Sequence, residues 1–398
     1  ITDHGNCSGY AHAYLHQKEM NKSGKKMKFL PGCEFYLHPD LKQWRIDKEK
    51  AAETKKNHDD AGADGLENEE ATKSKSTFDP VKRRHHLVVL PKTARGLDNL
   101  FTLVSKAHRD GYYRFPRIDY ALLKEHGEDL ICSTACVAGP LAAEVFACFP
   151  DIAWDDMRPT HDRFEIVQAN MQNCLDRLTD SLGDENVFLE LQFNRLGGQH
   201  LVNMHMLELA KRSGIRLVAT ADSHYCRPEW WQSREMYKKL SWLNYSEIDP
   251  SKLTQSKDDL KCELYPKNAQ QMWDEYKRTT SEYDFYDDEI VRDAIEATHD
   301  IAHSVIGDTS PDVSMKLPMG IIKKDDDPDT VLRDMTSDGM KRLGLSGKRE
   351  YEKRLEYELG VIRDQGFALY FITMKAIIDI AKANMMIGPG RGSSAGSL

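Results

Sequence analysis

The chain has 398 residues, which is enough for two or three domains. Of these residues, 40% are hydrophobic and 30% are charged, which is the composition of a globular protein. No apolar run approaches the roughly 20 residues of a membrane-spanning helix, and the opening residues lack the basic head and apolar stretch of a signal peptide. Eight scattered cysteines without a CxxC pair predict reduced thiols and a cytoplasmic location rather than a disulfide framework. The formal net charge of −9 excludes a bulk attraction to nucleic acid, but not a local basic binding surface.

Strand-like and helix-like segments alternate over the first 225 residues. Helical spacing of apolar residues is clearest in residues 96–111 and 201–214. Short apolar runs predict strands at residues 85–91, 186–194 and 215–225. Further strand signals lie at residues 27–37, further helix signals at 7–20 and 151–184, and a strand, loop and helix at 129–146. The alternation predicts an α/β domain with a largely parallel sheet that could close into a barrel, with ligands at the carboxyl ends of the strands.

Three regions depart from this alternation. Residues 39–84 have few apolar side chains and many charges, which predicts a solvated insertion or a flexible loop. Residues 226–308 are mostly helical and polar. A Pro/Asp-rich stretch at residues 307–320 marks a domain boundary near residue 309, and three helical segments follow it between residues 329 and 385.

Side chains of the types that bind metal ions stand at or just after several of the predicted strands. Imidazole, carboxylate and thiolate are the ligands of zinc, manganese and iron, and several such ions would polarise a phosphate ester and activate water. A single histidine at a strand end is more often structural, so the prediction rests on the whole set. Between the adjacent His85 and His86, alternation along the strand turns only one toward the site, and we expect His86 to be that one. The candidates are His4, Glu34, His86, Cys136, Asp222 and His224, with Asp3 also of ligand type.

The last twelve residues, IGPGRGSSAGSL, are typical of a loop that binds phosphate. Glycine lets the backbone approach a phosphate group and point N–H groups at its oxygens, and Arg391 would add a charge-assisted contact. Taken alone, a terminal Gly/Ser run is more often a flexible tail.

These motifs together resemble the polymerase-and-histidinol-phosphatase (PHP) domain and, over nearly the whole chain, the C-family bacterial replicative DNA polymerases, the DNA polymerase III alpha subunits. The stretches that carry the resemblance are TDHG, PGCEFYL, HHLVVL, GLDNLFTLVSKAHRDGYYRFPRIDYALL, FLELQ, VATADSHY, RLEYELGVIRDQGFALYF and IGPGRGSSAGSL. The last two of these stretches are the most specific, because they are hard to obtain by chance in this order.

The resemblance implies a PHP-type distorted α/β barrel over residues 1–308 and the first part of a polymerase-beta-like palm domain over residues 309–398. The six metal-type residues match ligand positions of the PHP pattern, with Zn²⁺ or Mn²⁺ as the implied ions and a metal-dependent 3′–5′ exonuclease as the implied activity. The family's opening His-x-His element lies upstream of TDHG and outside this sequence. ADSHY stands where the family often has Asn-Asp-x-His, and the stretch after Cys136 matches only loosely.

At the other end, Arg391, Gly392 and Ser393 match the family's Gly-Ser element, which holds the triphosphate of the incoming nucleotide. The catalytic aspartates that hold Mg²⁺ lie a few dozen residues further on in the family, so we expect a fragment of a template-directed DNA polymerase, truncated at both ends. The implied partners are primer–template DNA, deoxynucleoside triphosphates, a sliding clamp and other replisome subunits, with no membrane. A standalone PHP phosphoesterase and a non-catalytic PHP scaffold are the alternatives.

Overall fold

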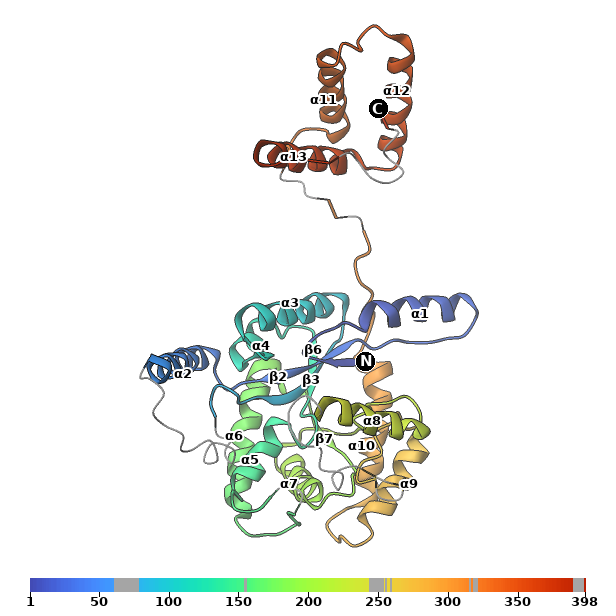
Figure 1. Cartoon of the computed structure of the whole chain (residues 1–398). Coiled ribbons are helices and arrows are strands. Elements are labelled where there is room, and N and C mark those ends of the chain that lie inside the picture. The colour runs from blue at the N-terminus through green and yellow to red at the C-terminus, as the bar shows by residue number, and fades with distance from the viewer. Residues whose placement is uncertain are drawn as a thin grey trace. The chain divides into compact units, whose positions relative to one another are not determined.

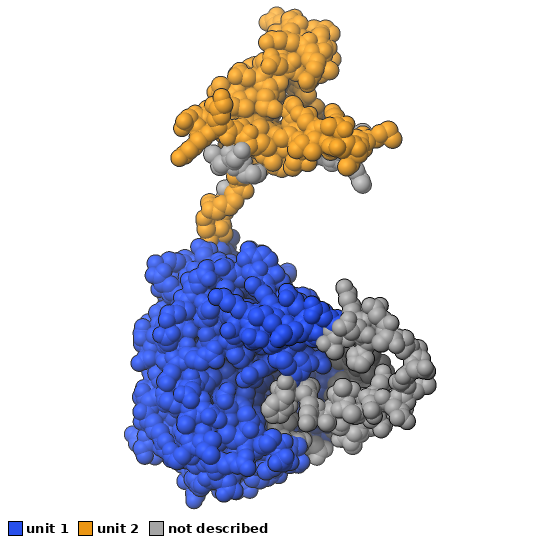
Figure 2. Space-filling model, turned by 90° about the vertical axis from the view of Figure 1, so that its left-hand side faces the viewer, with its two compact units in different colours: residues 1–311 blue, residues 312–398 orange. Residues whose placement is uncertain are grey.

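The computed structural model describes residues 1–60, 79–153, 156–242, 254, 256–257, 260–314, 316–317, 321–388 and 397–398. These residues form two compact units, Ile1–Pro311 and Asp312–Leu398, which Figure 2 shows in different colours. Among the described residues, no helix is both long enough and apolar enough to cross a bilayer.

Unit 1 is built around an eight-stranded mixed sheet (Figure 1). Its strands are β1 (Thr2–His4), β2 (Gly32–Leu37), β3 (His85–Pro91), β4 (Tyr112–Tyr113), β5 (Phe115–Ile118), β6 (Leu130–Ser133), β7 (Val187–Leu191) and β8 (Leu217–Ala219). They are ordered β4-β5-β2-β3-β6-β7-β8, and β1 pairs with β2 outside this path. The predicted α/β fold class is confirmed.

The sheet is less parallel than the alternation of segments predicted. Strand β3 runs antiparallel to both of its neighbours, β2 and β6, whereas β1–β2, β2–β5, β6–β7 and β7–β8 are parallel pairs. The long connection between β2 and β3 lets β3 enter the sheet from the opposite end. The reversal matters for the site, because the first residues of β3 then lie beside the last residues of its neighbours.

The helices of unit 1 lie around this sheet. They are α1 (Tyr10–Lys22), α2 (Leu41–Asp60), α3 (Ala94–Asp110), α4 (Tyr120–His126), α5 (Pro140–Ala147), α6 (Phe164–Leu182), α7 (Gly197–Ser213), α8 (Trp231–Trp242), α9 (Ala269–Thr280) and α10 (Asp288–Asp300), with short turns at Asp184–Asn186, Pro228–Trp230 and Ile301–Val305. The predicted helix at residues 151–184 begins only at Phe164, and the predicted strand at 215–225 is confined to Leu217–Ala219.

The main core lies between the sheet and these helices. Every residue of β2 is buried, and Phe35 and Leu37 belong to the same apolar cluster as Leu97 and Leu100 of α3. Helix α3 has the predicted apolar stripe and packs on β3 and β5. Thr93 caps its N-terminus, because the Thr93 side chain accepts a hydrogen bond from the Gly96 backbone N–H. A sheet packed in this way can hold the loops at its strand ends in fixed positions.

Residues 41–60, within the segment predicted as an insertion or loop, are in fact the helix α2. Its first turn is anchored by Leu41 and Trp44, both buried, and the Trp44 indole N–H donates to the backbone oxygen of Val81 at 3.0 Å. Alanine, glutamate and lysine have high helix propensity, which explains how so polar a segment continues as a helix. Residues 61–78 lie outside the described residues.

Unit 2 contains the three helices predicted beyond residue 329. They are α11 (Pro328–Arg342), α12 (Arg349–Asp364) and α13 (Ala368–Asn384). Asp327 caps α11, and Leu332, Leu359 and Ile372 form a small shared core.

Candidate metal centre

Three strands bring His4, Glu34 and His86 to one place. In the sheet, His4 at the end of β1 is paired with Glu34 of β2, and His86 at the start of β3 is paired with Tyr36, two residues from Glu34 on the same face. Parallel β1 and antiparallel β3 therefore deliver their histidines to the same end of β2, from sequence positions more than 80 residues apart.

The three side chains form a compact group of possible metal ligands. One ligand atom from each lies within 4.8 Å of the others. The Glu34 Oε1 atom is 2.5 Å from His86 Nδ1 and 3.3 Å from His4 Nδ1. Glu34 is buried, while the His86 and His4 side chains are 21% and 45% exposed, so the group is open to solvent on one side.

The surroundings of Glu34 Oε1 test whether this group suits a cation. The atom is buried and lies in ion-pair distance of Nδ1 of both imidazoles, although neither contact has hydrogen-bond geometry and no other donor among the described residues reaches it. Burial raises the pKa of Glu34, but the two imidazoles lower it further, and the resulting pKa is about 2. A buried carboxylate with a lowered pKa, flanked by two imidazoles, is a donor set that fits a divalent ion such as zinc or manganese.

Cys136 adjoins this group through His86. The Cys136 Sγ atom is 3.8 Å from His86 Nδ1, and the His86 backbone N–H donates to the oxygen of Ala138 in the same loop. The loop follows β6 directly and contains Ala135 with φ of +59°, a left-handed conformation that is costly for a residue with a Cβ. Burial raises the pKa of the Cys136 thiol, so only a bound cation would make it a thiolate ligand near neutral pH.

Asp222 and His224 lie in the loop after β8, where His224 is close to His4. The His224 and His4 ring centroids are 5.7 Å apart, and His224 Nδ1 lies 2.7 Å from the Asp222 backbone oxygen. Because a carbonyl only accepts, that contact puts a proton on Nδ1 and leaves Nε2 with the lone pair that a metal needs. Asp222 has φ of +45°, and burial, opposed by His224, raises its pKa.

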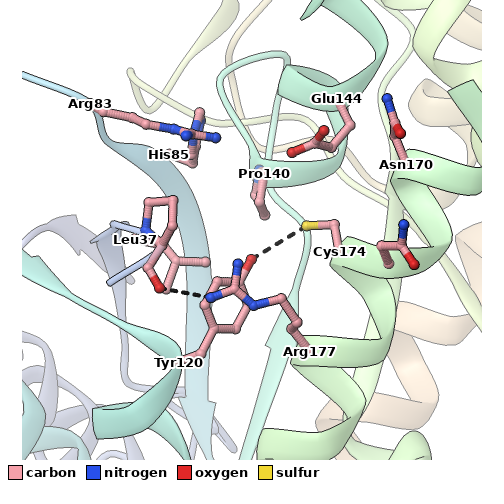
Figure 3. Close-up of a pocket in the computed structure, with 11 residues that line it drawn as sticks. Leu37, Arg83, His85, Tyr120, Pro140, Glu144, Asn170, Cys174 and Arg177 are labelled. Carbon is pink, nitrogen blue, oxygen red and sulfur yellow. Dashed lines mark hydrogen bonds between the residues drawn. The ribbon is translucent and has the colours of Figure 1, made fainter. Parts of the chain in front are cut away.

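Two residues near the candidates have structural roles. The Asp3 carboxylate accepts from the Gly9 backbone N–H at 2.6 Å, which fixes the entry to α1. His85 lines a separate pocket with Arg83, Tyr120 and other side chains (Figure 3). The Arg83 Nε–H donates to His85 Nε2 at 3.2 Å. Alternation along β3 thus turns His85 away from Glu34 and His86 toward it, as expected.

Sequence reasoning missed a buried carboxylate, Glu190, the fourth of the five residues of β7. Its side chain accepts hydrogen bonds from Ser133, Thr220 and Gln192. The available signal was a lone glutamate within the otherwise apolar run VFLEL, because a charged residue in a fully buried strand needs partners. Arg391, Gly392 and Ser393, predicted to bind nucleotide, lie outside the described residues.

A mixed α/β sheet that gathers histidine and carboxylate side chains of the metal-binding type near the ends of its strands resembles the arrangement of a PHP domain. The PHP domain family matches residues 1–194, and the bacterial DNA polymerase III alpha NTPase domain matches residues 330–398.

Curated relatives agree with both matches. The chain is 30% identical over 334 residues to the DNA polymerase III subunit alpha of Aquifex aeolicus, covering 82% of this chain and 26% of that relative. It is 26% identical to the subunit of Campylobacter jejuni and 27% identical to that of Treponema pallidum, in each case over 100% of this chain and over 30% and 28% of the relative. The chain is similar to bacterial DNA polymerase III alpha subunits over most or all of its length, and it spans less than a third of the length of these relatives.

Proposed function

We propose that this chain is part of a replicative DNA polymerase, and that the intact protein carries out template-directed DNA synthesis. The observation that carries the proposal is the order of two matches in one chain, a PHP domain followed by the polymerase NTPase domain. We assign residues 1–308 to the PHP domain and residues 309–398 to the first part of the palm. Primer–template DNA and deoxynucleoside triphosphates are the substrates, and a sliding clamp and other replisome subunits are the partners.

In the proposed palm, Arg391, Gly392 and Ser393 hold the triphosphate of the incoming nucleotide. Backbone N–H groups beside glycine and the Arg391 guanidinium suit phosphate oxygens. Mg²⁺ would be held by aspartates that this sequence does not contain. Reading the coding sequence past the codon for Leu398 tests this directly: a continuation with a Pro-Asp-x-Asp-like element supports the proposal, and a stop codon would indicate a split or broken gene.

In the PHP domain we propose a metal-dependent 3′–5′ exonuclease centred on His4, Glu34 and His86, with Cys136, Asp222 and His224 as further ligands. The close grouping of the His4, Glu34 and His86 ligand atoms, and the contact of His224 Nδ1 with the Asp222 backbone oxygen, support this set. When bound, zinc or manganese would polarise a phosphodiester and lower the pKa of a water molecule. The protein contributes the fixed, half-open arrangement of nitrogen, oxygen and sulfur donors around that position.

Metal analysis combined with a nuclease assay separates this proposal from its alternatives. We expect the purified chain to bind Zn²⁺ or Mn²⁺, and Glu34→Gln to weaken binding by at least about tenfold, since it removes the charged oxygen at the centre of the group. A matched control is Glu275→Gln, another buried glutamate, which pairs with Lys267 away from the candidate site. Equal metal binding by both variants would contradict the assignment of Glu34.

The substrate then decides between the remaining readings. A metal-loaded chain that shortens single-stranded DNA from its 3′ end supports the exonuclease. Hydrolysis of small phosphate esters without attack on DNA would favour a standalone PHP phosphoesterase. A chain that binds no metal would favour a non-catalytic scaffold.

A further inference from the structure

Glu190 lies at the junction of the two loops that carry Cys136, Asp222 and His224. It stands in β7, which pairs with β6 on one side and with β8 on the other. The Cys136 loop leaves the end of β6, and the Asp222/His224 loop leaves the end of β8. Glu190 is buried, and none of the six candidate ligands is hydrogen-bonded to it among the described contacts.

The side chain of Glu190 connects both loop bases. Ser133, three residues before Cys136, donates its Oγ–H to Glu190 Oε2 at 2.5 Å. Thr220, two residues before Asp222, donates its Oγ1–H to Glu190 Oε1 at 2.5 Å. Gln192, the residue directly after β7, donates to the same Oε1 atom at 2.9 Å and so helps to orient the carboxylate.

The backbone around Glu190 repeats the same connections. The Glu190 N–H donates to Thr134 Oγ1 at 2.9 Å, and the Thr134 N–H donates to the Phe188 oxygen at 3.1 Å. On the other side, the Thr220 N–H donates to the Leu191 oxygen at 3.0 Å. Each loop base is thus fixed to β7 by both a main-chain and a side-chain contact.

Both loops need this support, because each contains a residue in the left-handed region. Ala135 has φ of +59° and Asp222 has φ of +45°. Such conformations are unfavourable for residues other than glycine and persist only where surrounding contacts determine them. Ala135 lies two residues from Ser133 and one from Cys136, and Asp222 lies two residues from Thr220.

We propose that Glu190 is a positioning residue that sets the separation of the Cys136 loop and the Asp222/His224 loop, and so brings thiolate, carboxylate and imidazole to one ion. It acts through Ser133, Thr134 and Thr220 and does not touch the metal. The identity of these loops as ligand loops rests on the proposed function, whereas the coupling of the two loops by Glu190 rests on the contacts alone. The role depends on hydrogen bonding and shape rather than on charge.

Two substitutions separate shape from charge. In Glu190→Gln, the amide oxygen accepts from Thr220 and Gln192 and the amide N–H donates to the Ser133 oxygen, so all three connections persist. In Glu190→Ala all three are lost. Gln168→Ala is the matched control, because Gln168 is equally buried and hydrogen-bonded to His205, but on α6 and outside these loops.

Two measurements on the full chain distinguish these variants. Co²⁺ titration gives a dissociation constant, and the near-ultraviolet thiolate–Co²⁺ absorption reports whether Cys136 is a ligand. Hydrogen exchange of peptides spanning residues 134–139 and 220–225 reports the two loops without metal. We expect Glu190→Ala to bind Co²⁺ about 10–100-fold more weakly, to lose the thiolate band and to exchange faster in both loops. We expect the Co²⁺ dissociation constants of Glu190→Gln and Gln168→Ala to stay within about threefold of the native value, well below the ten- to hundredfold change expected for Glu190→Ala.

Each contrary result has a distinct meaning. If both loops of Glu190→Ala exchanged hydrogen at the rates of the native chain, the proposal would be overturned. A thiolate–Co²⁺ absorption band equal to that of the native chain would also overturn it. A Glu190→Gln variant as impaired as Glu190→Ala would show that charge, not position, is required. Equal loss in Gln168→Ala would show general destabilisation. If the native chain binds no Co²⁺, the proposed metal centre fails, and hydrogen exchange still decides the role of Glu190.

Discussion

Gly139 is the position where one added methyl group should disturb the candidate metal centre most directly. It follows the Cys136 loop, and its N–H donates to the Cys136 backbone oxygen. A Cβ at this position would lie 2.0 Å from the Thr134 oxygen and 2.9 Å from the Cys136 oxygen. The backbone angles of Gly139, φ −71° and ψ 166°, suit alanine, so contact with these carbonyls is the only obstacle.

The size of the clash sets the expected effect. Ordinary contacts of a Cβ begin near 3.4 Å, so Gly139→Ala requires the Thr134 carbonyl to move by about 1.4 Å, the difference between 3.4 and 2.0 Å. Overpacking of this kind costs about 1–3 kcal/mol, and each kcal/mol lowers Tm by about 2–4 °C in a domain of this size class. Because the moving segment carries Cys136, metal affinity should fall together with stability.

Thermal unfolding with and without Zn²⁺ measures both effects. At a Zn²⁺ concentration 100 times the dissociation constant, binding stabilises the native chain by about 2.7 kcal/mol, and a tenfold loss of affinity reduces this to about 1.4 kcal/mol. We therefore expect the Zn²⁺-dependent rise in Tm to halve in Gly139→Ala. A chelator should abolish the rise in the native chain.

Gly96→Ala is the control, because its Cβ would lie 2.2 Å from the Asp129 backbone oxygen, a similar clash at the start of α3. It should lose comparable stability and keep the full Zn²⁺-dependent rise. The reasoning is refuted if Gly139→Ala keeps that rise intact, or if the two variants lose it equally.

Three further predictions concern stability. Trp44→Ala should lower the free energy of unfolding in urea by about 3–5 kcal/mol, since it empties a buried site and removes the hydrogen bond to Val81. Replacing the exposed Ile46 by alanine should change this free energy little. Equal effects of the two substitutions would contradict the anchoring of α2 by Trp44. Burial lowers the pKa of His205 to about 4, below its ordinary 6.5, so the unfolded chain binds a proton that the folded chain does not. Stability should be full above pH 6.5 and fall toward pH 4, and a His205→Gln variant with an unaltered pH profile would contradict this. Gly360→Ala, in mid-α12 with open space around it, should stabilise unit 2 by about 0.5–1 kcal/mol, and a lower Tm would show a contact that the structure lacks.

Much of the local structure was predictable because its signals are local. The strand at residues 85–91 and the three helices after residue 329 follow from short-range spacing, and His86 rather than His85 faces Glu34 because side chains alternate along a strand. The ligand-type residues could be named for the same reason, since each stands beside a strand signal. Helix α2 was missed because its buried anchor is two side chains in a polar segment, and Val81, the hydrogen-bond partner of Trp44, is 37 residues away in sequence.

The sequence by itself determined which residue types stand at the strand ends, and hence the kind of chemistry this protein can support. Only the tertiary structure decided that β3 runs antiparallel, which places His86 beside Glu34, and that Glu190 joins the loops of Cys136 and Asp222. Strand direction and these buried hydrogen bonds depend on groups separated by 30 to 57 residues, whereas periodicity reports only neighbours within a few residues. Such contacts are settled when the whole sheet assembles.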